Sequence, residues 1–269
     1  MIYTYKHTVL ERDGRMASET EKIDSANWLD YLKANQERYG NLHEFVESSM
    51  QAIKAENPLI AASVAMQIDE TFRDREPTAV FQYAMHCWNA FKAGEISAEA
   101  WGAVLAQAWQ SGQRSMLDSV ALSEALVIRM FEAADKEALF QVGASRKGWG
   151  EYLATLPEEI AVFRGISTGS KQMENGFCWT LDAEEAKKYS GHNVQTAQDI
   201  PGILQARIPK QALLAVFDIG QAVVVNPAVA KAEVKTNFLS GAGLAKFRQN
   251  WKKWKAEEAR KIKEAQKAF

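Results

Sequence analysis

The feature that most constrains the fold is a change of sequence pattern at Pro157. Before it, apolar residues recur three or four positions apart, as on one face of a helix, and residues 18–156 are expected to be helical. After it, short runs rich in valine, isoleucine and aromatic residues alternate with polar stretches, which indicates β-strands. We therefore predict an α+β protein with a helical N-terminal region (1–156), a strand-rich region (157–240) and a basic C-terminal helix (241–269).

Within the strand-rich region, the pattern places five strands and one short helix. Residues 182–189 are expected to be the helix, because Asp182 is a favourable N-cap and two glutamates follow it in the first turn. Before this region, the glycine- and cation-containing segment 143–150 is the best candidate for an internal loop. The expected strands are 160–164, 177–180, 202–208, 213–217 and 222–225.

Composition excludes several classes of protein. The chain has 269 residues, 47% hydrophobic and 25% charged, as in ordinary globular proteins. No apolar run approaches the roughly 18 residues of a membrane span, so no membrane partner is expected. Cys87 and Cys178 lack the spacing of a zinc site or a disulfide framework, and the four histidines are scattered, so no metal is expected. Without an N-terminal secretory pattern, a reducing, cytoplasmic location is expected.

The C-terminal segment is basic and aromatic. Residues 246–269 contain nine Lys or Arg against three Asp or Glu, whereas residues 1–150 contain 15 against 21. Phe247, Trp251 and Trp254 recur at helical spacing among these cations. Two interpretations stay open: the aromatic residues dock on the protein and leave the lysines in water, or the segment binds nucleic acid or an acidic protein.

Three short segments follow one another in a fixed order in the strand-rich region. They are residues 162–165 (Val-Phe-Arg-Gly), 177–180 (Phe-Cys-Trp-Thr) and 220–227 (Gly-Gln-Ala-Val-Val-Val-Asn-Pro). Together they resemble the Arg, Ser-x-Thr and Glu signature of mono-ADP-ribosyltransferases, over residues 160–230 of this chain. The resemblance implies an ADP-ribosyltransferase-like mixed β-sandwich with short helices in residues 157–240, and NAD as the substrate.

The resemblance also implies roles for particular residues. Arg164 corresponds to the arginine that holds NAD, and guanidinium groups suit phosphates through paired hydrogen bonds. The backbone of Gly165 is expected to contact the nicotinamide amide. Thr180 corresponds to the hydroxyl that orients the ribose and the catalytic carboxylate. Tyr189 lies where the family often places an aromatic ring against the nicotinamide.

This chain departs from the signature at two catalytic positions. Cys178 stands where the family usually has serine, and Ala222 stands where it has the catalytic glutamate. Two explanations are open for Ala222. The chain is either an inactivated form in which Glu was changed to Ala, or a natural non-catalytic module that binds NAD, ADP-ribose or a partner.

With the glutamate present, the resemblance implies transfer of ADP-ribose from NAD to a macromolecular acceptor, which is a protein, RNA or DNA. Family members of this size are often toxins of toxin–antitoxin or anti-phage systems. The expected partners are therefore the acceptor and a neutralising antitoxin protein.

Overall fold

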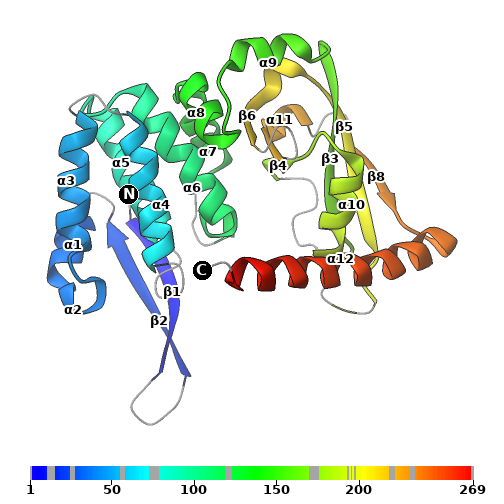
Figure 1. Ribbon diagram of the computed structural model, residues 1–269, viewed down its shortest axis with the longest axis horizontal. Helices are drawn as coiled ribbons and strands as arrows, with labels where there is room; N and C mark the ends of the chain where they lie inside the picture. Colours follow the sequence, from blue (N-terminus) through cyan, green and yellow to red (C-terminus); the bar gives the residue numbers. More distant parts are fainter. Residues whose placement is uncertain are drawn as a thin grey trace. The chain divides into compact units, whose positions relative to one another are not determined.

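The computed structural model consists of helices and small antiparallel sheets, so the chain is α+β (Figure 1). The chain divides into two compact units, Met1–Gly150 and Glu151–Phe269, called unit 1 and unit 2 below. This division falls at the end of segment 143–150, and residues 241–269 belong to unit 2. The structure describes residues 2–10, 16–24, 28–54, 58–72, 79–118, 123–169, 176–192, 194, 196, 198–217, 222–230 and 234–267.

Unit 1 begins with a β-hairpin that the sequence pattern did not predict. Strand β1 (Ile2–Leu10) pairs with β2 (Met16–Asp24) in an antiparallel register that includes every residue of both strands. The prediction of helix from residue 18 onward is therefore wrong for residues 18–24. The cause is the partner strand: β1 is rich in β-branched and aromatic residues, and pairing with it overrides the weak local preference of β2.

The rest of unit 1 is helical and is built around large aromatic side chains. Helix α6 contacts α4, α5 and α8, and the rings of Trp101 and Trp109 on α6 are fully buried. The Nε1 of Trp101 donates a hydrogen bond to the carbonyl of Met130 at 2.9 Å. The helices are α1 (Trp28–Ala34), α2 (Gln36–Tyr39), α3 (Leu42–Lys54), α4 (Pro58–Phe72), α5 (Ala79–Lys92), α6 (Ala98–Asp118), α7 (Glu124–Glu132) and α8 (Lys136–Gly143), followed by α9 (Trp149–Thr155) at the unit boundary.

Unit 2 contains two three-stranded antiparallel sheets. In the first, β3 (Glu159–Ser167), β5 (Pro201–Pro209) and β8 (Lys235–Phe238) lie in that order. In the second, β4 (Cys178–Trp179), β7 (Ala222–Val225) and β6 (Leu213–Phe217) lie in that order. A single bridge between Phe163 and Thr180 connects the two sheets. The five predicted strands correspond to β3–β7.

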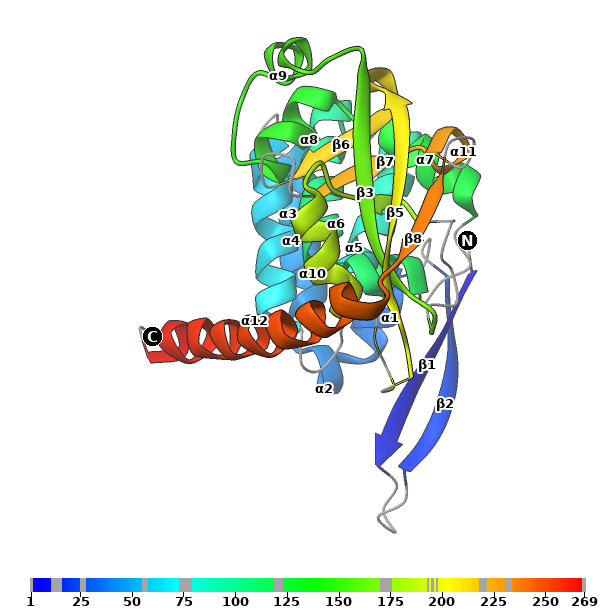
Figure 2. The same ribbon diagram turned by 90° about the vertical axis from the view of Figure 1, so that its right-hand side faces the viewer.

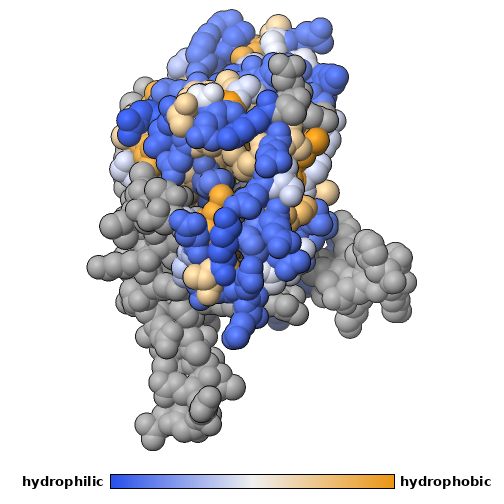
Figure 3. Space-filling model, turned by 90° about the vertical axis from the view of Figure 1, so that its left-hand side faces the viewer, coloured by the Kyte–Doolittle hydropathy of each residue, from blue (hydrophilic) through white to orange (hydrophobic). Residues whose placement is uncertain are grey.

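Two helices of unit 2 pack beside the first sheet (Figures 1 and 2). Helix α10 (Ala183–His192) lies against β3 and β5, and α12 (Gly241–Lys267) contacts α10. The short helix α11 (Pro227–Ala230) follows β7, and a 3₁₀ turn (Lys210–Ala212) precedes β6. None of the described helices combines the length and apolar composition needed to cross a membrane. The face shown in Figure 3 is largely hydrophilic where it is coloured, with apolar residues scattered in small groups.

Candidate functional site

The side chain of Arg164 is the most unusual polar group of unit 2. Arg164 lies on β3, opposite Leu204 of β5. Its Nη1 atom is buried and makes no hydrogen bond among the described residues. Burial lowers the pKa of the guanidinium, while the nearby Cys178 acts in the opposite direction. Because arginine remains protonated in proteins, Arg164 is a half-buried cation whose buried Nη1 has no hydrogen-bond acceptor among the residues that the structure describes.

Gly176 makes room for this guanidinium. A Cβ atom added to Gly176 would collide with the Nη1, Cζ and Nη2 atoms of Arg164. The carbonyl of Gly176 accepts a hydrogen bond from the Nε1 of Trp179 at 2.7 Å, and Trp179 is only 2% exposed. The buried indole therefore fixes the backbone against which the guanidinium lies. Sequence reasoning missed Gly176, because no local pattern shows that an arginine twelve positions earlier fills its side-chain space.

Strand pairing brings the other predicted residues next to Arg164. Phe163 and Thr180 exchange two backbone hydrogen bonds of 2.8 Å each, so Thr180 lies beside the residue that precedes Arg164. On β4 and β7, Cys178 pairs with Val224, and continuing this antiparallel register by two residues places Thr180 opposite Ala222. Side chains that oppose each other in this way have Cβ atoms about 5 Å apart.

Cys178 and Thr180 face the same side of their strand, because side chains alternate along it. Thr180 is 3% exposed, and its Oγ1 accepts a hydrogen bond of 3.0 Å from the backbone N–H of Asp182. Asp182 in turn accepts a bond of 2.8 Å from the N–H of Glu184 in the first turn of α10. The Thr180 hydroxyl is thus fixed as an acceptor at the start of α10 and keeps its own proton to donate.

Gly165 and Tyr189 meet through the backbone of α10. A Cβ atom at Gly165 would collide with the carbonyl oxygen of Ala186 and the backbone nitrogen of Ser190, and would lie 2.7 Å from the carbonyl carbon of Tyr189. Only glycine allows the helix to approach β3 this closely. The Tyr189 side chain itself is 52% exposed. Strand pairing therefore places Thr180 beside Phe163 and, by extension of the β4–β7 register, opposite Ala222, while Cys178 acts electrostatically on Arg164. The backbone of Tyr189 lies on Gly165, and much of its ring is at the surface.

The start of the third sequence segment, Gly220 and Gln221, lies outside the described residues. Ala222 itself is described: it pairs with Phe217 of β6 and is partly exposed. Within the described part of the chain, no group of three or more His, Cys, Asp or Glu side chains is arranged to hold a metal ion.

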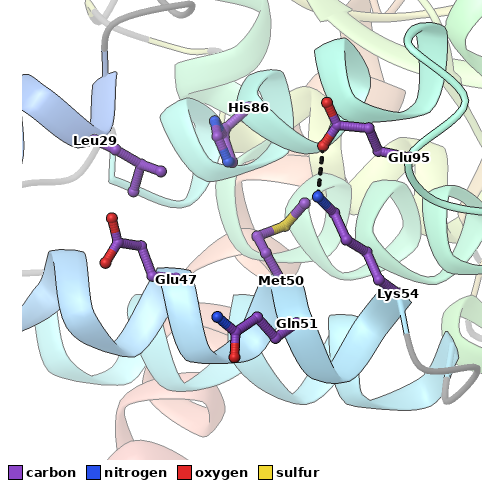
Figure 4. A pocket seen from close by; sticks show the side chains of 7 residues that line it. All are labelled: Leu29, Glu47, Met50, Gln51, Lys54, His86 and Glu95. Carbon is purple, nitrogen blue, oxygen red and sulfur yellow. Dashed lines mark ion pairs between the residues drawn. The ribbon is translucent and has the colours of Figure 1, made fainter.

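A pocket of about 460 Å³ lies in unit 1, where sequence reasoning placed no site (Figure 4). It could have been suspected from the spacing of its residues on α3, which recur at i, i+3, i+4 and i+7. None of the six predicted site residues lines it. The lining residues are Leu29, Glu47, Met50, Gln51, Lys54, His86 and Glu95.

The charges of this pocket are largely paired within unit 1. The Nζ of Lys54 lies 2.7 Å from the carboxylate of Glu95, as the dashed line in Figure 4 marks. Glu47 lies 2.5 Å from Lys33, and this hydrogen bond lowers the pKa of Glu47. Burial lowers the pKa of His86, which favours its neutral form. These internal pairs leave Arg164 and its neighbours as the stronger candidate site.

Comparison of the chain with protein-family models, with curated proteins and with solved structures found no match. The candidate site therefore rests on the geometry of its own residues.

Proposed function

We propose that unit 2 has an ADP-ribosyltransferase-like fold and binds NAD beside Arg164, as in a mono-ADP-ribosyltransferase that modifies a macromolecular acceptor. The observation that carries this proposal is the buried Nη1 of Arg164, which has no hydrogen-bond partner in the described part of the chain and lies near Cys178. A buried charge is costly unless it is paired, so such a group is well suited to an anionic ligand. The pyrophosphate of NAD supplies acceptors of the required charge and geometry.

The proposed chemistry explains why a carboxylate at position 222 matters. Cleavage of the glycosidic bond of NAD builds positive charge on the ribose, and a preorganised carboxylate stabilises that charge. In this arrangement Arg164 holds the phosphates and Thr180 orients the ribose. Ala222 lies opposite Thr180 in the strand register, so a glutamate there would extend over the same region. With alanine, the site keeps its binding groups and lacks the stabilising charge.

A second candidate function follows from the same alanine. A natural chain with Ala222 would be a non-catalytic module that binds NAD, ADP-ribose or a partner. An inactivated form of an enzyme would instead have glutamate at this position in its natural gene, and the need for inactivation would point to a cytoplasmic toxin with a neutralising antitoxin. Sequencing position 222 in the natural gene separates the two candidates.

The test of the enzyme proposal is Ala222→Glu, with Ala222→Gln as the matched control of nearly equal volume and no charge. Release of nicotinamide from NAD is measured by chromatography, with and without protein, RNA and DNA fractions. We expect the Glu variant to be about 10²–10³-fold faster than the Gln variant, with NAD affinity little changed. Equal rates for the two variants would contradict the proposed role of position 222.

A further inference from the structure

The aromatic residues of α12 are used inside unit 2. Phe247 is 3% exposed and stacks on Trp251, with ring centroids 6.2 Å apart and an interplanar angle of 9°. The Trp251 ring lies over Gly191 of α10, where an added Cβ would come within 2.6 Å of it. Trp254 packs edge-on against both other rings. The aromatic face of α12 therefore docks on the rest of unit 2, as one of the two interpretations of this segment predicted.

Docking of this face leaves three lysines of α12 on the other side. Lys246, Lys252 and Lys253 are exposed, and we call them the cationic face. At 100° per residue, these three lysines are turned away from Phe247, Trp251 and Trp254, whereas the Nζ of Lys255 lies over the Trp251 ring, 5.3 Å from its centroid.

Helix α12 is connected to β3 through α10. Ser190 of α10 packs against Gly165, the neighbour of Arg164, and the next residue, Gly191, packs against Trp251 of α12. The pKa of Lys188 on α10 is raised chiefly by a hydrogen bond to Glu185 and, to a smaller extent, by Glu257 of α12. Helix α12 is therefore anchored to α10, the helix that packs on β3 (Figure 2).

We infer that the cationic face of α12 binds the phosphate backbone of a nucleic acid, the acceptor of the proposed transferase. Because it makes the nucleic acid the acceptor of ADP-ribose, this inference rests on the proposed transferase function. Stable protein–protein interfaces contain a buried apolar centre. The exposed side of α12 offers charge, because its aromatic rings are already packed on unit 2. Binding dominated by charge is characteristic of phosphate backbones.

This mode of binding has a definite signature. Base stacking on aromatic rings gives affinity that depends on exposed rings, whereas phosphate contacts give steep dependence on salt and little dependence on sequence. Because Trp251 and Trp254 are engaged with Phe247 and α10, we expect the second behaviour.

The test compares the full chain with two triple variants of equal charge change. In the first, Lys246, Lys252 and Lys253 become Gln; in the control, the exposed Lys92, Lys147 and Lys235 become Gln. Fluorescence anisotropy measures binding of a labelled single-stranded RNA, and of DNA of the same sequence, from about 50 to about 200 mM salt. We expect the α12 variant to bind about tenfold more weakly or worse, with a log–log salt slope reduced by about 2, and the control to change less than about twofold.

Three outcomes would overturn the inference: no measurable binding by the unaltered chain, equal loss in the two variants, or competition by poly-aspartate as effective as by RNA, which would indicate an acidic protein partner. NAD binding by the same proteins is followed by saturation-transfer NMR. If the unaltered chain binds NAD but its RNA binding does not depend on the α12 lysines, this inference alone is contradicted. RNA binding without NAD binding would contradict the transferase proposal and would still support the cationic face of α12 as a nucleic-acid-binding surface.

Discussion

The two units differ in the kind of polar atom that they bury without a partner. In unit 1, the described residues include the Nε1 of Trp28 and the Nδ1 of His43, which belong to uncharged or weakly basic rings. In unit 2, the corresponding atom is the Nη1 of a guanidinium. Burying a neutral polar group without a hydrogen-bond partner costs about 1–3 kcal/mol of stability, and burying an unpaired charge costs more. Among the described residues, the unpartnered buried atom of unit 2 therefore belongs to a cation, and the proposed anion site rests on this difference.

The largest expected effect is on the free energy of unfolding of unit 1 when a cavity is made in its core. Replacing the fully buried Trp101 with Ala should lower the free energy of unfolding of unit 1 by about 3–5 kcal/mol. Met66→Ala, at a side chain that is 45% exposed, is the control and should change it by less than about 0.5 kcal/mol. Denaturant unfolding measures both. A small effect of Trp101→Ala would show that aromatic packing does not dominate unit 1.

A second prediction concerns the close approach of α10 to β3 in unit 2. Gly165→Ala introduces a Cβ where backbone atoms of α10 already lie, so it should destabilise unit 2 by about 1–3 kcal/mol. The control is Gly243→Ala in α12, where a Cβ meets nothing within 4 Å, and it should be neutral or stabilising. Thermal unfolding of both variants gives the comparison. Equal behaviour of the two variants would mean that α10 is not seated on Gly165.

The smallest expected effect is the pH dependence contributed by His86 in unit 1. Its pKa is lowered by burial, so the unfolded chain binds this proton more readily than the folded one. Stability should therefore fall as pH drops below about 6.5 and level off below the lowered pKa of the folded state. Carboxylates with lowered pKa, such as Glu47 and Glu95, lose their stabilising charge only at more acidic pH. His86→Gln should flatten the dependence of the melting temperature on pH near 6; an unchanged profile would exclude this role.

Much of the framework of unit 2 could be predicted from local pattern. The runs 213–217 and 222–225 are rich in β-branched or aromatic residues and are the strands β6 and β7 with those bounds. Asp182 and its following glutamates correctly marked the start of α10. The spacing of Phe247, Trp251 and Trp254 allowed docking as one outcome for α12. Each of these signals lies within a few neighbouring residues.

The missed elements depend on partners far away in the chain. Strand β8 has four exposed residues and exists because its backbone pairs with β5. Strand β2 depends on β1 in the same way. At the candidate site, the order of motifs suggested Arg164, Thr180 and Ala222, but the fit of the guanidinium against Gly176 is a property of the folded chain. The pocket of unit 1 likewise requires α1, α3 and α5 to be assembled.

The most direct test of the central claim is calorimetric titration of NAD into the unaltered chain and into Arg164→Met. Methionine keeps an apolar stem of similar length and removes the buried charge. We predict that the unaltered chain binds NAD and that the variant binds it at least about tenfold more weakly, since hydrogen bonds to charged groups contribute about 1.5–3 kcal/mol. The unfolding free energy of unit 2 should not fall, because the variant no longer buries an unpaired charge. Equal NAD affinity of the two proteins, or no NAD binding by either of them, would contradict the account.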